Sequence, residues 1–261
     1  MALTRLDKFL ADHTPHSRSE VRLLLRQGSV CVDGQCIRDG STRIDPDVRC
    51  ITLCGKPLRG GGHRYIVLHK PQGFVCATQD REMPTVIDLV PEELRVKGLF
   101  PAGRLDADTT GLVLLTDDGP LAHRMLAPRH HVPKYYLVRL ARPHAADDIR
   151  RFADGITLSD GTQCLPAQVY FPGACAAVLC LHEGRYHQVK RMFAALGNHV
   201  EALHRAAVGG YLLPQKLAPG GCLEILHKDV EKMLESSPYD VICERIMTDF
   251  SSYWINDGRE V

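Results

Sequence analysis

Hydrophobic and polar positions follow a helical period at the start of the chain. Leu6, Phe9 and Leu10 would share one helix face, which predicts a short helix ending near Thr14 and Pro15. Further along, residues 29–53 contain short runs of apolar residues that are broken by Asp-Gly and Asp-Pro pairs. These runs predict short strands joined by turns.

A second helix is predicted between these elements. Ser17 and Glu20 form the S-x-x-E pattern in which each residue caps a free backbone amide at a helix start. Val21, Leu24 and Leu25 supply an apolar stripe, so one helix face is expected to be buried. Gly28 stands where a helix C-terminal cap belongs, and we expect the helix to end there.

The hydrophobic pattern changes further along the chain. Residues 65–70 predict a strand that Pro71 ends, and residues 74–77 predict a second, short strand. The apolar run 112–116 predicts a buried central strand, and Asp118 with Pro120 predicts the start of the helix that follows it. Because strands and helices mix without regular βαβ alternation, we expect an α+β fold on a mixed, largely antiparallel sheet.

Glycines divide the chain into parts. The stretch GKPLRGGGHR, residues 55–64, holds a proline and three consecutive glycines, which predicts a linker with neither helix nor strand. We therefore expect a small domain with its linker at residues 1–60, a larger domain at 61–228, and an acidic extension at 229–261. No function is evident for the extension, which we expect to dock on the larger domain or to fray.

Composition narrows the class of protein. The chain has 261 residues, 44% of them hydrophobic and 24% charged, which is typical of a globular protein. It has no apolar run long enough for a membrane helix, and we expect a cytoplasmic, monomeric protein with no membrane partner. Its ten cysteines form no C-x-x-C pair, so reduced and mostly buried thiols are expected.

Histidines offer little support for a metal site. The pairs His182/His187 and His199/His204 lack the H-x-x-x-H spacing that puts two imidazoles on one helix face. We expect neither a metal ion nor any other cofactor.

Charge is unevenly distributed. The net charge is only +1, but residues 229–261 carry eight acidic and three basic residues, which leaves residues 1–228 with a net charge of +6. Arg18, Arg22 and Arg26 recur every fourth residue on the second predicted helix, with Arg5 and Lys8 on the first. A solvated helix face would look the same, but five cations on one small unit are what an RNA backbone requires. Residues 3–50 resemble an S4 domain, a small RNA-binding module, and the resemblance implies that these five residues bind RNA.

Candidate catalytic chemistry lies in the stretch GRLDADTTGLVLLTDDG, residues 103–119. Its first part is rich in turn formers and predicts a loop held by the strand at 112–116. Arg104, Asp106 and Asp108 alternate with apolar residues, so an extended loop would place all three on one side. This pattern suits either an ionised catalytic carboxylate or a structural ion pair.

GRLDADTTGL resembles the signature of the RsuA-type pseudouridine synthases. The resemblance continues through LHKPQGFVC (68–76), PRHHVPKYYLV (128–138) and HEGRYHQVKRMFAALGNHVEALHR (182–205). It implies that Asp106 is the catalytic carboxylate, that Tyr136 is the active-site tyrosine, and that Lys190 is the basic partner of the aspartate. We also expect Arg104 to bind the substrate. Without the resemblance, Tyr136 would be an ordinary strand aromatic and Lys190 a solvated helix charge.

The resemblance implies a cofactor-free enzyme that flips a uridine out of small-subunit (16S) ribosomal RNA and isomerises it to pseudouridine. Three alternatives stay open. The first is a large-subunit synthase, whose relatives usually have GRNRQ where this chain has Tyr186 and His187. The second is a catalytically silent S4-type ribosome-assembly protein. The third is a glycosidase, which would need two carboxylates with separate roles and could use Asp108 as the second.

Overall fold

The computed structural model describes residues 3–46, 49, 51–58, 63–127, 130, 132–235, 237–250 and 253. The chain forms two compact units, residues 1–63 and 64–261. None of the helices in the described part is long and apolar enough to cross a membrane.

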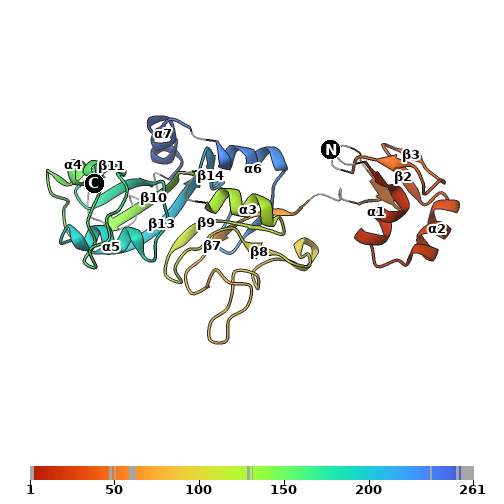
Figure 1. The fold of residues 1–261 in the computed structure, drawn as a ribbon, viewed down its shortest axis with the longest axis horizontal. Helices are drawn as coiled ribbons and strands as arrows, with labels where there is room; N and C mark the ends of the chain where they lie inside the picture. Colours follow the sequence, from red (N-terminus) through yellow and green to blue (C-terminus); the bar gives the residue numbers. More distant parts are fainter. Residues whose placement is uncertain are drawn as a thin grey trace. The chain divides into compact units, whose positions relative to one another are not determined.

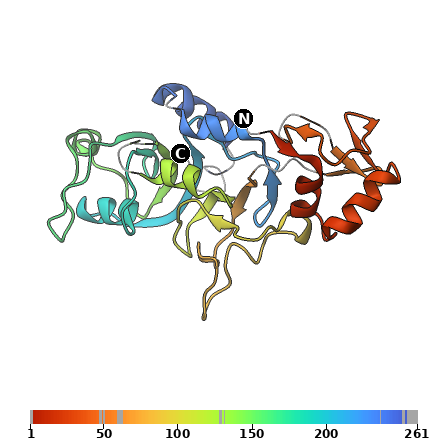
Figure 2. The same cartoon turned by 45° about the vertical axis from the view of Figure 1, so that its right-hand side comes forward.

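The first unit combines two helices with short strands (Figure 2). Its helices are α1 (Leu6–His13) and α2 (Arg18–Arg26). Strand β1 (Thr4–Arg5) pairs with β4 (Arg43–Ile44), and a second sheet has the order β3-β2-β5-β6, made of β2 (Val30–Val32), β3 (Gln35–Cys36), β5 (Ile51–Leu53) and β6 (Lys56–Leu58). A single apolar core joins helices and strands, formed by Leu6, Phe9, Leu10, Val21, Leu25, Val30, Ile44 and Ile51.

Local sequence signals of this unit are confirmed. The Ser17 hydroxyl accepts from the Glu20 amide, and the Glu20 carboxylate accepts from the Ser17 amide, so the predicted capping box is complete. Gly28 follows α2 with φ +74°, the left-handed conformation of a C-terminal cap. The Asp33-Gly34 pair joins β2 to β3 with both φ angles positive, as a tight hairpin requires.

The predicted linker is partly wrong. Residues 56–58 form strand β6, although a proline lies in its middle. Strand β6 is the edge strand of its sheet, so one of its two sides pairs with no other strand. A proline is tolerated in such a strand because an N–H missing on the unpaired side removes no hydrogen bond of the sheet. Residues 59–62, which include the three consecutive glycines, lie outside the described residues.

The second unit is built on one large mixed sheet, as predicted (Figure 1). Its main strand order is β11-β12-β10-β13-β9-β7-β15, with β8 beside β9 and β14 beside β13. Every described pair in it is antiparallel except β9 with β13, which run parallel. The strands are β7 (Tyr65–Lys70), β8 (Phe100–Pro101), β9 (Thr110–Thr116), β10 (Lys134–Leu140), β11 (Gln168–Gly173), β12 (Ala176–Leu181), β13 (Val200–Val208), β14 (Tyr211–Leu212) and β15 (Cys222–Glu224).

Helices cover both faces of this sheet, which is why its central strands are apolar throughout. The helices are α3 (Gly119–Leu126), α4 (Asp148–Asp154), α5 (Gln188–Ala195), α6 (His227–Leu234) and α7 (Tyr239–Asp249), with a short 3-10 turn at Glu92–Leu94. Helices α4 and α5 share one core with the face that carries Val113 and Tyr136. Helices α3, α6 and α7 pack on the opposite face, against Leu112, Leu114 and Tyr135 (Figure 1).

The predicted helix start at Asp118 and the buried strand at 112–116 are confirmed. The Asp118 carboxylate accepts from the Leu121 amide and caps α3, whose first turn holds Pro120. The strand predicted at 74–77 is wrong, since only Val75 forms an isolated bridge, to Thr85. The segment instead bends so that the Cys76 thiol meets the backbone amide of Leu105.

The acidic extension packs on the second unit over much of its length. Its two helices bury apolar side chains in the cores of the second unit, Val230 and Met233 from α6 and Ile242 and Ile246 from α7. Trp254 and Ile255, near the chain end, lie outside the described residues.

Strands β9 and β13 approach closely where they pair. Gly111 lies opposite Arg205 with φ +111°, and a Cβ built on it would lie 2.3 Å from the Arg205 carbonyl oxygen. Beside it, the ring Nδ1 of buried His204 lies 2.8 Å from the Thr110 hydroxyl, and the ring contacts Phe250. These contacts fix the start of β9, which the loop 103–109 directly precedes.

Gly111→Ala is expected to destabilise the second unit by about 2–4 kcal/mol, because it combines a left-handed backbone with a steric clash in a packed sheet. Urea unfolding followed by circular dichroism measures the change. Gly119→Ala is the matched control, since an added Cβ at Gly119 meets no atom within 4 Å and lies in a helix. Equal stability of both variants would contradict the close approach.

His204 predicts a pH dependence of stability. Burial, with a smaller contribution from His69, lowers the pKa of His204 from 6.5 to about 3. Between these values the unfolded chain takes up a proton that the folded chain excludes, so stability falls as pH falls below about 6.5. The slope from this group approaches about 1.4 kcal/mol per pH unit. Unfolding free energies measured from pH 7 to 5 should show a shallower slope in His204→Phe than in the wild type.

Candidate active site

The loop 103–109 leaves the sheet between β8 and β9, as the sequence predicts. Residues 106–109 form a turn in which the Thr109 amide donates to the Asp106 carbonyl. The loop is therefore not extended along its length. Asp106 keeps 27% of its side chain exposed and reaches the cavity beside the loop.

A buried lysine holds this turn from inside the protein. Lys70, at the end of β7, is fully buried, and its Nζ donates to the carbonyl oxygens of Pro71, Asp106, Ala107 and Thr109 at 2.7–3.2 Å. Burial lowers the pKa of Lys70, and the neighbouring Asp106 and Asp108 carboxylates act in the opposite direction. These carbonyl dipoles replace the water that a buried ammonium group loses.

Two further contacts fix the start of the loop. Arg205, itself buried, donates from Nε to the Leu112 carbonyl and from Nη1 to the Arg104 carbonyl, at 2.8 and 3.4 Å. The Leu105 amide donates to the Cys76 sulfur at 3.3 Å. The backbone on both sides of Asp106 is thus held by side chains from three other segments.

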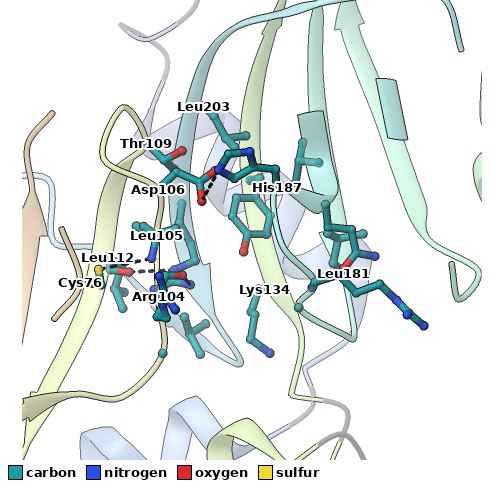
Figure 3. Close-up of a pocket in the computed structure, with 18 of the residues that line it drawn as sticks. Cys76, Arg104, Leu105, Asp106, Thr109, Leu112, Lys134, Leu181, His187 and Leu203 are labelled. Atoms are coloured by element: carbon teal, nitrogen blue, oxygen red, sulfur yellow. Dashed lines mark hydrogen bonds and ion pairs between the residues drawn. The ribbon is translucent and has the colours of Figure 1, made fainter. Parts of the chain in front are cut away.

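Two basic side chains from the start of α5 face the Asp106 carboxylate. Lys190 Nζ lies 3.4 Å from Asp106 Oδ2, and His187 Nε2 lies 3.5 Å from Asp106 Oδ1. The imidazole and the carboxylate point toward each other in Figure 3. Lys190 also forms a shorter pair with Asp108, at 2.6 Å. The structure therefore brings Asp106 and Lys190 together.

Asp108 has a different environment from Asp106. Its side chain is 69% exposed, and it is not part of the cavity lining. Partial burial raises the pKa of Asp108, but the hydrogen bond and charge of Lys190 outweigh it and leave the pKa below its usual value. Asp108 thus stays ionised at neutral pH and holds Lys190 in place.

A cavity of about 630 Å³ lies beside the carboxylate. Asp106, Arg104 and Tyr136 all contribute to its lining, as do apolar residues such as Leu181 and Leu203 (Figure 3). Tyr136 lies on β10 and is 8% exposed, so its ring is positioned by the sheet. An apolar cavity with a few polar groups is typical of a small-molecule or base-binding site.

The predicted row of Arg104, Asp106 and Asp108 does not form. Arg104 is exposed and lines the cavity, but no ion pair joins it to either aspartate among the described side chains. The turn at 106–109 is the reason, because it ends the extended backbone on which the row depended. The cation beside both aspartates is Lys190.

Three functional contacts were missed from the sequence. Lys70 and Arg205 lie in the stretches 68–76 and 182–205, and the sequence alone predicted no role for either of them. A basic residue inside an apolar strand could have indicated a buried cation with a specific partner.

The sequence suggested His187 as a metal ligand and as a marker of the target RNA, but not as a neighbour of Asp106. It instead faces Asp106 from a left-handed backbone conformation, which is uncommon for a residue with a Cβ. No cluster of three or more possible metal ligands occurs in the described part of the chain.

The five basic residues that the sequence predicts to bind RNA are all exposed. Arg18, Arg22 and Arg26 lie along α2, and Lys8 lies on α1. Arg5 is already paired with the Asp7 carboxylate through two hydrogen bonds, the shorter 2.7 Å. Of these five predicted RNA-binding residues, Arg5 is thus already paired with a carboxylate.

Comparison with known proteins agrees with this site. Residues 64–195 match the family described as RNA pseudouridylate synthase, and residues 4–50 match the S4 domain. The chain is 46% identical over 218 residues to the ribosomal small subunit pseudouridine synthase A of Yersinia pestis, covering 83% of this chain and 92% of that protein. Its counterpart in Escherichia coli strain K12 is 44% identical over 234 residues, which cover 88% of this chain and all of that protein.

A solved structure described as a pseudouridylate synthase matches with a TM-score of 0.62 and 39% identity, over 88% of this chain and 99% of that one. The resemblance noted in the sequence is therefore confirmed for both units. The first unit is an S4 domain, and the chain belongs to the RNA pseudouridylate synthase family.

Proposed function

We propose that this protein isomerises a uridine of small-subunit ribosomal RNA to pseudouridine, with Asp106 as its catalytic carboxylate. One observation carries the assignment of the residue. Two carboxylates line the cavity, Asp106 and Glu183. Glu183 is taken up by hydrogen bonds from Arg185 and Gln188, whereas Asp106 lies between two basic side chains on a loop held at its backbone. A carboxylate at such a position is suited to act as a nucleophile or base.

The reaction begins with extrusion of the uridine from its stack, at a cost of roughly a few kcal/mol. Tyr136 presents a ring inside the cavity on which the flipped base can stack. Arg104, exposed at the same cavity, is suited to a phosphate or ribose oxygen of the flipped nucleotide.

The chemistry is an isomerisation and needs no outside reactant. The bond between N1 of the base and C1′ of the ribose breaks, the uracil turns, and a bond from C5 to C1′ forms. C5 loses its proton and N1 gains one. Attack of the carboxylate at C1′, its addition to C6, and removal of a proton from C2′ are three routes to this result. All three require Asp106 as an anion, and Lys190 and His187 are the side chains that face its carboxylate.

The names of the relatives support small-subunit RNA as the target. Proteins 44–46% identical to this chain are named ribosomal small subunit pseudouridine synthase A. Tyr186 and His187 occupy the cavity lining at the point where large-subunit synthases usually have asparagine and arginine. The S4 domain, with its row of arginines on α2, is suited to bind the RNA backbone. We infer that the protein acts as a monomer in the cytoplasm, because a single chain holds both Asp106 and Tyr136 at one cavity and the proposed substrate is ribosomal RNA.

Asp106→Asn is expected to abolish activity, lowering it by at least roughly 100-fold, because the amide cannot act as an anionic nucleophile or base. Pseudouridines are mapped in ribosomal RNA from cells that lack the protein and then receive the wild type or the variant. One small-subunit site should be restored by the wild type and not by the variant.

Asp108→Asn is the matched control, since Asp108 also pairs with Lys190 but lies outside the cavity lining. Its activity should remain within about tenfold of the wild type, because it removes one ion pair of Lys190 and no reacting group. Equal and complete loss in both variants would instead favour a two-carboxylate mechanism of the glycosidase kind. Restoration by Asp106→Asn, or a change confined to large-subunit RNA, would overturn the proposal.

The S4 domain gives a separate prediction. Replacing Arg18, Arg22 and Arg26 with Gln should weaken binding to small-subunit RNA and reduce the salt dependence of binding, by about one unit of slope for each phosphate that is no longer neutralised. Filter binding at several salt concentrations measures both. Arg5→Gln should have a smaller effect, because Arg5 is already paired with Asp7. Asp106→Asn should bind RNA nearly as the wild type does, and equal loss of binding in all variants would contradict this division of roles.

A further inference from the structure

Two aromatic rings are stacked at the cavity beside the catalytic loop. The rings of Tyr186 and His187 have centroids 3.8 Å apart and planes within 19° of parallel. Both residues line the cavity. Tyr186 is nonetheless 74% exposed, the most open of the large apolar or aromatic side chains in the described part of the chain. The mechanism above uses His187 through its contact with Asp106 and leaves Tyr186 without a role.

The segment that carries the stack is fixed by hydrogen bonds at both ends. Gln188 accepts from the Arg185 amide at 2.9 Å and donates to the Glu183 carboxylate at 2.7 Å. Arg191 donates to the Tyr186 carbonyl at 3.4 Å, while its other terminal nitrogen pairs with Asp160. Tyr186 is therefore exposed on an ordered backbone. A ring held in this way loses little conformational entropy when a ligand stacks on it.

The geometry leaves Tyr186 one open face. His187 covers the other face of the ring, and the Nε2 of His187 lies 3.5 Å from the Asp106 carboxylate. An apolar ring face left in water beside a nucleic-acid site is suited to a nucleobase, because every base has a π-face to stack. Arg185 and Arg191 lie on the same segment but each is already paired with a carboxylate, so the ring face is the feature of this segment that is open to a ligand.

We propose that the open face of Tyr186 stacks against an unpaired base adjacent to the flipped uridine. The flipped base itself belongs inside the cavity, with Tyr136 and Asp106, so the base on Tyr186 is a neighbour in the RNA strand. Tyr186 thus makes a subsite for a flanking nucleotide, and through His187 this subsite adjoins the catalytic carboxylate. The proposal rests on the proposed function, since it takes RNA with a flipped uridine as the substrate.

Stacking of this kind binds the substrate and the transition state equally, so its loss should raise KM and leave kcat nearly unchanged. Tyr186→Ala is expected to raise KM by about 5- to 150-fold, the range that corresponds to about 1–3 kcal/mol per stacked base. Tyr186→Phe should stay within about twofold of the wild type, because it keeps the ring. The assay is pseudouridine formation on small-subunit ribosomal RNA from cells that lack the protein.

Tyr170→Ala is the matched control. Tyr170 is 48% exposed on the edge strand β11 and does not line the cavity. Its replacement should leave KM unchanged. An unchanged KM in Tyr186→Ala, or a rise in KM in Tyr186→Phe as large as in Tyr186→Ala, would overturn the proposal.

A second measurement does not depend on the modified site. The chain has a single tryptophan, Trp254, so Tyr186→Trp in a Trp254→Phe background places one fluorophore at the subsite. Its emission should be quenched on addition of a single-stranded RNA oligonucleotide, whereas Tyr170→Trp in the same background should change little.

The two measurements separate the subsite from the proposed function. Quenching at position 186 together with no modification of small-subunit RNA by the wild type would mean that the proposed target is wrong and the stacking surface is real. Normal modification without quenching would mean the reverse, and the stacking proposal would fail.

Discussion

The buried ammonium group of Lys70 is the interaction on which the active site most depends. It lies at the end of β7 and donates to carbonyl oxygens of the turn that begins at Asp106 as well as to Pro71. An ammonium group without such partners would be costly inside the protein, so the turn and the lysine require each other. Since β7 is paired along its whole length with β9, the position of the turn is transmitted directly from the sheet.

The parallel contact between β9 and β13 completes this support. Gly111 allows the two backbones to meet, and Arg205 then reaches across to the carbonyls of Leu112 and Arg104. The same pair of strands brings His204 beside Thr110, where the C-terminal extension contributes Phe250 and Tyr253 to its surroundings. The extension is thus part of the packing behind the catalytic loop. This gives the acidic segment a structural place that its sequence did not indicate.

What the sequence predicted correctly was local. The Ser17 capping box, the Asp33-Gly34 turn and the Asp118 helix cap each depend on residues a few positions apart, and all three formed. The apolar run 112–116 was equally clear, because a strand covered on both faces must be apolar throughout. The family motifs then indicated Asp106 and Lys190, which the fold brings within 3.4 Å of each other.

What was missed depends on distant residues. Lys70 and Thr109 are 39 positions apart, and Arg205 and Leu112 are 93 apart, so no local pattern connects either pair. Strand β6 was missed because its proline is tolerated only at the edge of a sheet, and the sheet order is not visible in the sequence. The row of charges at 104, 106 and 108 failed for a related reason, since its extended geometry was assumed, whereas Lys70 stabilises a turn.

The contacts of Asp106 explain how one carboxylate can be both held in place and available to react. Lys190 is closer to Asp108, at 2.6 Å, than to Asp106, at 3.4 Å, and His187 lies 3.5 Å from the Asp106 carboxylate. An arginine at position 190 could bind Asp106 with two parallel hydrogen bonds, but a lysine is a point charge that two aspartates can share. Asp108 therefore holds the cation, and Asp106 lies beside two basic side chains without a short hydrogen bond to either. Its oxygens are left for the substrate that enters the cavity.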